Sequence, residues 1–125
     1  VGTRDFPSIA GLGAAIDFLN YYGFDLLVQR NLNLRNLLYE SLDGVPGIRM
    51  ASPAGGGMAA PMIALEFEPV RPAENVAEKL FVDHGVEVKV LPPDILNGIR
   101  VSTHVYNNEP DIEKFVAGLR KVLST

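Results

Sequence analysis

The chain of 125 residues contains no cysteine and only two histidines, and these absences exclude several kinds of chemistry. Without thiols there are no disulfides, no thiolate metal ligands and no cysteine nucleophile within the chain. The two histidines, His84 and His104, stand apart in the sequence with no partnering carboxylate motif, so no metal-ligand pattern is present. Metal catalysis by these residues is therefore not expected.

Basic clusters and long apolar runs are also missing. The net charge is -4 at pH 7, and no run of lysines and arginines offers a surface for nucleic acid or for an anionic membrane. No apolar stretch approaches the ~20 residues that a membrane span needs. The first residues lack the basic-then-apolar order of a signal peptide. We therefore expect a cytoplasmic protein whose partners are small molecules or other proteins.

What the chain does contain is the composition of an ordinary globular domain. Hydrophobic residues make up 47% of the chain and charged residues 21%, which is enough apolar material for one buried core at this length. The single break in composition is a Pro/Gly-rich stretch over residues 53–61, which we interpret as a loop within one domain. No repeat or low-complexity tract is present.

Apolar residues at helical spacing predict four helices. Capping residues and prolines mark where they begin, and glycines mark where most of them end. The predicted spans are residues 5–23, 24–42, 72–85 and 108–123. The apolar stripes consist of Ile9, Leu12, Ile16 and Leu19 in the first helix, Leu27, Leu34, Leu38 and Leu42 in the second, Val76 and Leu80 with Phe81 as a further candidate in the third, and Ile112, Phe115, Val116, Leu119, Val122 and Leu123 in the last.

Four strands are predicted between these helices from alternating apolar and polar residues. They cover residues 48–52, 62–68, 86–90 and 98–106. The order along the chain is therefore helix, helix, strand, strand, helix, strand, strand, helix. This order predicts an α+β fold, in which helices cover one face of a small, largely antiparallel sheet of about four strands, preceded by two helices.

The fourth predicted strand carries the most informative side chains. Apolar Ile99 and Val101 alternate with Arg100 and Ser102, and the alternation continues to residue 106, so that one strand face is apolar and the other polar. The planar guanidinium of Arg100 can grip a carboxylate through two parallel charge-assisted hydrogen bonds, which fixes the orientation of a bound anion. The simpler interpretation is a solvent-exposed arginine on the polar face of an antiparallel strand.

Other features invite a functional interpretation that the sequence does not support. The triglycine at residues 55–57 lacks the Lys-Ser/Thr ending of a nucleotide-binding loop and suits a hairpin connection. Glu66 and Glu68 share a strand face, but adjacent carboxylates of this kind are usually solvated. Lys89 stands among alternating valines and is expected to be a solvated strand residue, not a Schiff-base lysine. His84 complements the dipole at a helix end.

Two segments near the ends of the chain carry a resemblance to a known family. The arginine strand leads through Tyr106-Asn107 into an acidic stretch that opens an amphipathic helix, and Gly2-Thr3 precedes the segment Phe-Pro-Ser-Ile-Ala-Gly-Leu-Gly-Ala-Ala-Ile-Asp-Phe-Leu at residues 6–19. In this order, the two segments resemble the C-terminal region of class V aminotransferase-fold enzymes, which depend on pyridoxal phosphate. The resemblance covers nearly the whole chain.

The resemblance implies the small C-terminal domain of a larger enzyme. In that family a large domain holds the cofactor and a small domain closes over the substrate; here residues 1–44 correspond to connecting helices and residues 45–125 to the small domain. Arg100 matches the position that binds the α-carboxylate of the substrate. Thr3, together with Gly2, matches the position where a hydroxyl and a backbone amide reach the cofactor phosphate of the neighbouring subunit, which implies a homodimer.

The same resemblance implies that this chain alone does not complete the chemistry. The family's Schiff-base lysine and the aspartate that pairs with the pyridine nitrogen both precede the Gly-Thr segment, so neither has a counterpart here. The chain is therefore expected to be a fragment. The full-length protein is expected to be a pyridoxal-phosphate enzyme acting on an amino acid by epimerase, lyase or transaminase chemistry.

Within the family, the absence of cysteine favours one branch. Cysteine desulfurases and selenocysteine lyases place a cysteine on the loop before the arginine strand, where this chain has Leu-Pro-Pro-Asp-Ile-Leu-Asn at residues 91–97. A cysteine desulfurase relative is thus disfavoured unless the thiol comes from elsewhere, and the nearer resemblance is to the isopenicillin-N-epimerase-like branch. The alternative class is a stand-alone α+β binding or interaction module without catalysis, because a fold alone does not specify a function.

Overall fold

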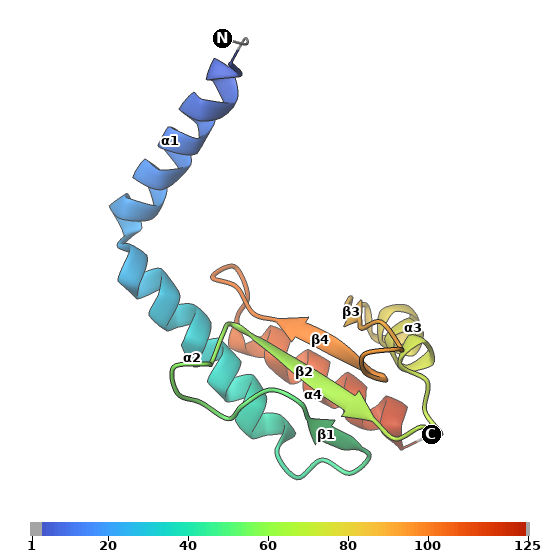
Figure 1. Ribbon diagram of the computed structural model, residues 1–125. Helices are drawn as coiled ribbons and strands as arrows, with labels where there is room; N and C mark the ends of the chain where they lie inside the picture. The colour runs from blue at the N-terminus through green and yellow to red at the C-terminus, as the bar shows by residue number, and fades with distance from the viewer. Residues whose placement is uncertain (1–3, 125) are drawn as a thin grey trace.

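The computed structural model describes residues 4–124, and its order of helices and strands is the one predicted from the sequence. Figure 1 shows two consecutive helices leading into a sheet packed against further helices. The fold class predicted from the sequence, an α+β arrangement with a small antiparallel sheet, is therefore confirmed. The elements are α1 (Phe6–Tyr22), α2 (Phe24–Leu42), β1 (Ile48–Met50), β2 (Met62–Phe67), α3 (Ala73–His84), β3 (Lys89–Val90), β4 (Gly98–Ser102) and α4 (Glu109–Leu123).

The four strands form one open sheet in the order β1-β2-β4-β3, and every neighbouring pair is antiparallel. The long central pair sets the register, with Ala64 opposite Arg100 and Leu65 opposite Ile99. Residues 51–61 connect β1 to β2, so the triglycine lies in a hairpin connection as predicted.

One face of this sheet is buried beneath α2, α3 and α4 (Figure 1). Ile63, Leu65, Phe67 and Ile99 belong to this face, and each is at most 3% exposed. Burying a large apolar side chain stabilises the fold by about 1.5–3 kcal/mol, so this layer is the main source of stability. The helix side chains that complete the core are Leu34, Leu38, Leu42, Ala73, Val76, Leu80, Ile112, Phe115, Val116, Leu119 and Leu123.

The predicted apolar stripes of α2, α3 and α4 are largely confirmed. Leu27 and Val122 are only partly buried. Phe81, the further candidate in α3, is 60% exposed, so that prediction is wrong. Phe81 follows the fully buried Leu80 by one residue, and a step of one residue turns a helical side chain by about 100° away from the core, since a turn takes about 3.6 residues.

α1 extends away from the rest of the chain (Figure 1). The Asp5 side chain accepts a hydrogen bond from the Ser8 backbone N–H at 3.2 Å, which caps the helix as its sequence suggests. Gly23, at a φ of 87°, ends it and turns the chain into α2. No residue of α1 is buried. Its predicted apolar stripe is 38–62% exposed and does not belong to the core: Ile9, Leu12, Ile16 and Leu19.

The strands are shorter than predicted, most of all the third and the fourth. The third is confined to Lys89–Val90, and the fourth ends at Ser102 instead of residue 106. Beyond it, the backbone N–H of His104 donates to the Asn107 side chain, and the backbone N–H of Asn107 donates to the His104 carbonyl, both at 2.9 Å. This local turn satisfies backbone groups that would otherwise extend the ladder, so residues 104–106 leave the sheet.

Candidate functional site

The sheet face opposite the core carries the polar side chains of the strands, and no helix within residues 4–124 covers it (Figure 1). Successive side chains of a strand point to opposite faces. Because Ile99 is fully buried, the adjacent Arg100 projects to the open face, where it is exposed. The cross-strand partners of Arg100 are Ala64 on β2 and Lys89 on β3. This open face is therefore the candidate site.

Some charged side chains on the open face form an ion pair, and others have no partner of opposite charge within residues 4–124. Arg49 and Glu66 lie opposite each other on β1 and β2 and form an ion pair. Glu66, which the sequence suggested would be solvated, is instead partly buried by this contact. Arg100 and Lys89 are both cations, and no carboxylate among residues 4–124 lies within 4.0 Å of either. Ala64, the β2 partner of Arg100, is uncharged and has only a methyl side chain.

Gly98 lets β4 approach β2 closely just before Arg100. A Cβ atom at Gly98 would lie 2.0 Å from the carbonyl oxygen of Leu65 and 3.0 Å from its carbonyl carbon. No side chain fits at that distance, so the position requires glycine. This close contact fixes the position of β4 against β2. It thereby also fixes the backbone position of Arg100, two residues further along the strand.

Asn97 is a positioning residue that the sequence did not single out. Its side-chain oxygen accepts a hydrogen bond from the Ala73 backbone N–H at 2.9 Å, which satisfies a donor at the start of α3. Its amide nitrogen donates to the carbonyls of Phe67, Glu68 and Arg71 at 3.0–3.3 Å. One side chain thus ties the start of β4 to the end of β2 and to α3. An asparagine directly before a strand, after a proline-rich loop, was the available signal.

A second residue missed from the sequence is Arg35 on α2, which is completely buried. Its guanidinium donates to the carbonyl oxygens of Pro53 and Ala54 and lies 4.7 Å from the centre of the Tyr39 ring. These contacts hold the beginning of the Pro/Gly-rich loop, residues 53–61, against α2. The role is structural, and it lies away from the open face.

An ion pair fixes the segment that follows β4. The guanidinium of Arg30 on α2 donates to both carboxylate oxygens of Glu109, at 2.6 and 3.1 Å. These hydrogen bonds lower the pKa of Glu109 from 4.5 to about 2 and raise the pKa of Arg30. The buried Thr103 adds a hydroxyl bond to the carbonyl of Asn31 at 3.2 Å. The turn after the arginine strand is thereby held against α2.

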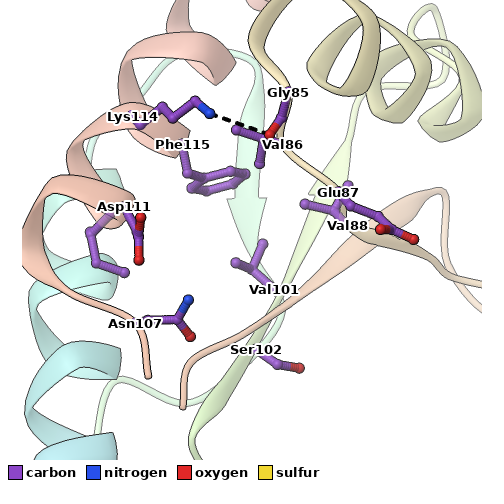
Figure 2. Close-up of a pocket in the computed structure, with 11 residues that line it drawn as sticks. Gly85, Val86, Glu87, Val88, Val101, Ser102, Asn107, Asp111, Lys114 and Phe115 are labelled. Atoms are coloured by element: carbon purple, nitrogen blue, oxygen red, sulfur yellow. Dashed lines mark hydrogen bonds between the residues drawn. The ribbon is translucent and has the colours of Figure 1, made fainter. Parts of the chain in front are cut away.

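A cavity of about 240 Å³ opens where residues 86–88 diverge from β4. Figure 2 shows Val86 and Phe115 at one end of it and Val101 further along, with Lys114 donating to the Gly85 carbonyl at 3.3 Å. Its lining includes Val101 and does not include Arg100. The lining also includes Ser102 and Glu87, which stand two residues from Arg100 and Lys89, but it contains neither of these cations.

None of the lysines is buried within this chain. All four are exposed, whereas a Schiff-base lysine works from a desolvated pocket: Lys79, Lys89, Lys114 and Lys121. Gly2 and Thr3, which the resemblance places at a cofactor phosphate, lie outside the described residues. Between residues 4 and 124 no cluster of three or more histidine, aspartate or glutamate side chains could hold a metal ion. No helix in that range is long and apolar enough to cross a membrane.

Comparison with known proteins decides the family. The family described as Aminotransferase class-V matches residues 1–115, which is most of the chain. The chain belongs to the class V aminotransferase family. Enzymes of this family use pyridoxal phosphate, so the resemblance seen in the sequence is confirmed.

Individual relatives cover nearly all of this chain but only part of their own length. Isopenicillin N epimerase of Amycolatopsis lactamdurans is 29% identical over 121 residues, which is 97% of this chain and 30% of the epimerase. A probable cysteine desulfurase of Chlamydia trachomatis serovar D is 29% identical over 131 residues, which is 98% of this chain and 32% of the relative. The solved structure of a NifS-like protein has the same fold, with a TM-score of 0.78 at 22% identity over 99% of this chain and 35% of that one. The chain thus spans about a third of the length of these proteins.

Proposed function

We propose that this chain is the substrate-closing C-terminal domain of a pyridoxal-phosphate enzyme that acts on an amino acid, and that Arg100 binds the carboxylate of that substrate. The observation that carries the proposal is an arginine with no carboxylate partner within residues 4–124, on a sheet face that no described helix covers. A guanidinium in this state can form two parallel hydrogen bonds to a carboxylate. Its β2 partner, Ala64, is uncharged and has only a methyl side chain.

The exposed apolar side of α1 supports the view that a further domain belongs to the enzyme. The stripe from Ile9 to Leu19 is 38–62% exposed. An apolar helix stripe of this extent is normally packed against another element. In this proposal residues 1–44 are connecting helices that pack on the cofactor domain, and residues 45–125 form the small domain. In this proposal the cofactor lysine belongs to that other domain, as the resemblance to the family implies, and the lysines of this chain have other roles.

The proposed enzyme is a homodimer, in which Gly2 and Thr3 reach the cofactor phosphate of the neighbouring subunit. A two-fold dimer would then have two composite sites. In mixed dimers, a Thr3→Val subunit should weaken cofactor retention at the site of its wild-type partner and leave its own site intact. A defect confined to the mutated subunit's own site, or a fully active monomer, would contradict this arrangement.

The reaction proposed is removal of the α-proton of an amino acid, as in epimerase, lyase or transaminase chemistry. Relatives at the same 29% identity include both an epimerase and a probable cysteine desulfurase, so identity does not choose between them. Sulfur abstraction requires a thiolate nucleophile. Residues 91–97 contain no cysteine, and neither does the rest of the chain, which weighs against the desulfurase branch.

Comparing an amino-acid substrate with its α-amide tests the role of Arg100 in the full-length enzyme. The amide cannot accept two charge-assisted hydrogen bonds, so wild-type kcat/KM should favour the amino acid by about tenfold or more. Arg100→Gln should remove this preference by lowering only the value for the amino acid. Lys121→Gln, at an exposed position on α4, is the control and should keep the preference. If Arg100→Gln also keeps it, Arg100 does not bind the carboxylate.

A further inference from the structure

We propose that Lys89 is a second anion-binding residue of this site and that it selects substrates carrying a second acidic group. The inference rests on the proposed function of Arg100, and it names a substrate class: amino acids with an acidic side chain. Lys89 was expected from the sequence to be an ordinary solvated strand residue. Its position in the sheet changes that interpretation.

Lys89 lies directly opposite Arg100 in the antiparallel pair of β3 and β4. Their strand neighbours, Val90 and Ile99, form the next pair of the register and turn to the opposite face, where Ile99 is fully buried. Lys89 and Arg100 therefore share the open face. Side chains in such a pair have Cβ atoms about 4.5–5.5 Å apart, and like charges in this position destabilise the sheet. The pair is therefore electrostatically unfavourable unless an anion lies between the two cations.

Among residues 4–124, no carboxylate forms an ion pair with either cation. Glu66, on the same face, is engaged by Arg49. Glu87 stands two residues before Lys89, but in the described part of the chain it forms no ion pair with Lys89 or Arg100. Two neighbouring cations without a carboxylate between them are the arrangement expected of a binding site for an external anion.

The two cations provide more positive charge than one carboxylate requires. The fork of Arg100 engages both oxygens of a single carboxylate, which leaves the ammonium of Lys89 free to bind a second group. The opposite neighbour of Arg100 is the uncharged Ala64, so the positive charge is on one side only. A substrate whose α-carboxylate is bound by Arg100 would therefore place its second acid toward β3. An acidic amino acid neutralises both cations, whereas a neutral one leaves Lys89 unpaired.

Acidic amino acids and their isosteric amides test this selectivity in the full-length enzyme. The probes are aspartate against asparagine and glutamate against glutamine, which match in shape and differ by one charge. Wild-type kcat/KM should favour the acid in at least one pair by about tenfold or more. Lys89→Gln should lower the value for the acid about tenfold, mainly through KM, and leave the amide nearly unchanged. Lys89→Arg keeps the charge and should retain most of the preference, and Lys121→Gln should have no effect.

Each remaining outcome contradicts one specific statement. Equal losses for acid and amide in Lys89→Gln would mean that Lys89 serves the α-carboxylate or the fold, and would overturn the inference. So would an unchanged preference, or a wild-type enzyme with no preference for the acid. If Arg100→Gln lowers kcat/KM for both the acid and its amide, while Lys89→Gln changes kcat/KM for neither, only the proposed role of Lys89 is contradicted. If Arg100→Gln changes kcat/KM for neither the acid nor the amide, the proposed function itself is contradicted.

Discussion

Gly98 and Leu65 approach each other so closely between β4 and β2 that a Cβ atom on Gly98 would lie 2.0 Å from the Leu65 carbonyl oxygen. Gly98→Ala must therefore push the strands apart, and we expect a loss of about 1–3 kcal/mol in the free energy of unfolding, measured by chemical denaturation. Gly11→Ala is the matched control, because α1 leaves open space there and alanine favours a helix by about 0.5–1 kcal/mol over glycine. Equal stability of the two variants would contradict the claim that a side chain at position 98 clashes with the Leu65 carbonyl.

Arg35 gives a second prediction for stability. Arg35→Met keeps an aliphatic stem on α2 but removes the donors for the carbonyls of Pro53 and Ala54. We expect a loss of about 1.5–3 kcal/mol in the free energy of unfolding, as for other hydrogen bonds from charged groups. Because the guanidinium holds the loop at residues 53–61, limited proteolysis should also cut this loop faster. Arg4→Met, at an exposed position, should change neither measurement.

The ion pair between Arg30 and Glu109 predicts a pH-dependent contribution to stability. The pKa of Glu109 is lowered to about 2 in the folded chain from 4.5. A carboxylate with a lowered folded pKa stabilises the fold fully above its unfolded pKa, and this contribution is lost as the pH falls toward the folded pKa. The contribution of Glu109 should therefore be complete above pH 4.5 and decline from there toward pH 2.

Denaturation of the wild-type chain and of Glu109→Gln at several pH values tests this dependence. The wild type should be more stable than the variant at neutral pH, and the difference should shrink as the pH is lowered below 4.5. In an Arg30→Gln background the same comparison should show little pH dependence, because the partner is gone. Glu113→Gln, at an exposed position on the same helix, is the control. A difference between wild type and Glu109→Gln that stays constant with pH would show that the pair does not lower the pKa.

Much of the fold follows from local sequence. The number and order of helices and strands, and the buried stripes around Leu38, Leu80 and Leu119, were predictable because period and capping residues are local signals. The end of β4 was not predictable by alternation alone, since the side chain of Asn107 closes a competing turn. The exposure of α1 was also missed, because apolar spacing does not tell which partner covers a stripe.

The candidate site was predictable only in part. Arg100 was predicted from alternation to lie on a polar strand face, and it is exposed next to the buried Ile99; its role at the site stays a prediction. The pairing of Lys89 with Arg100 depends on how β3 is aligned with β4, which no local pattern specifies. Asn97 and Arg35 bond to carbonyls 18 to 30 residues away in sequence, so their roles appear only in three dimensions.

The most direct measurement of the central claim is steady-state turnover of an amino-acid substrate by the full-length enzyme carrying Arg100→Lys. Lysine keeps the positive charge but cannot reproduce the two parallel hydrogen bonds of the guanidinium. We predict a fall in kcat/KM of tenfold or more, equivalent to about 1.4 kcal/mol or above of lost transition-state stabilisation. Kinetics indistinguishable from those of the wild type would show that Arg100 is a surface residue of the open face and does not bind the carboxylate.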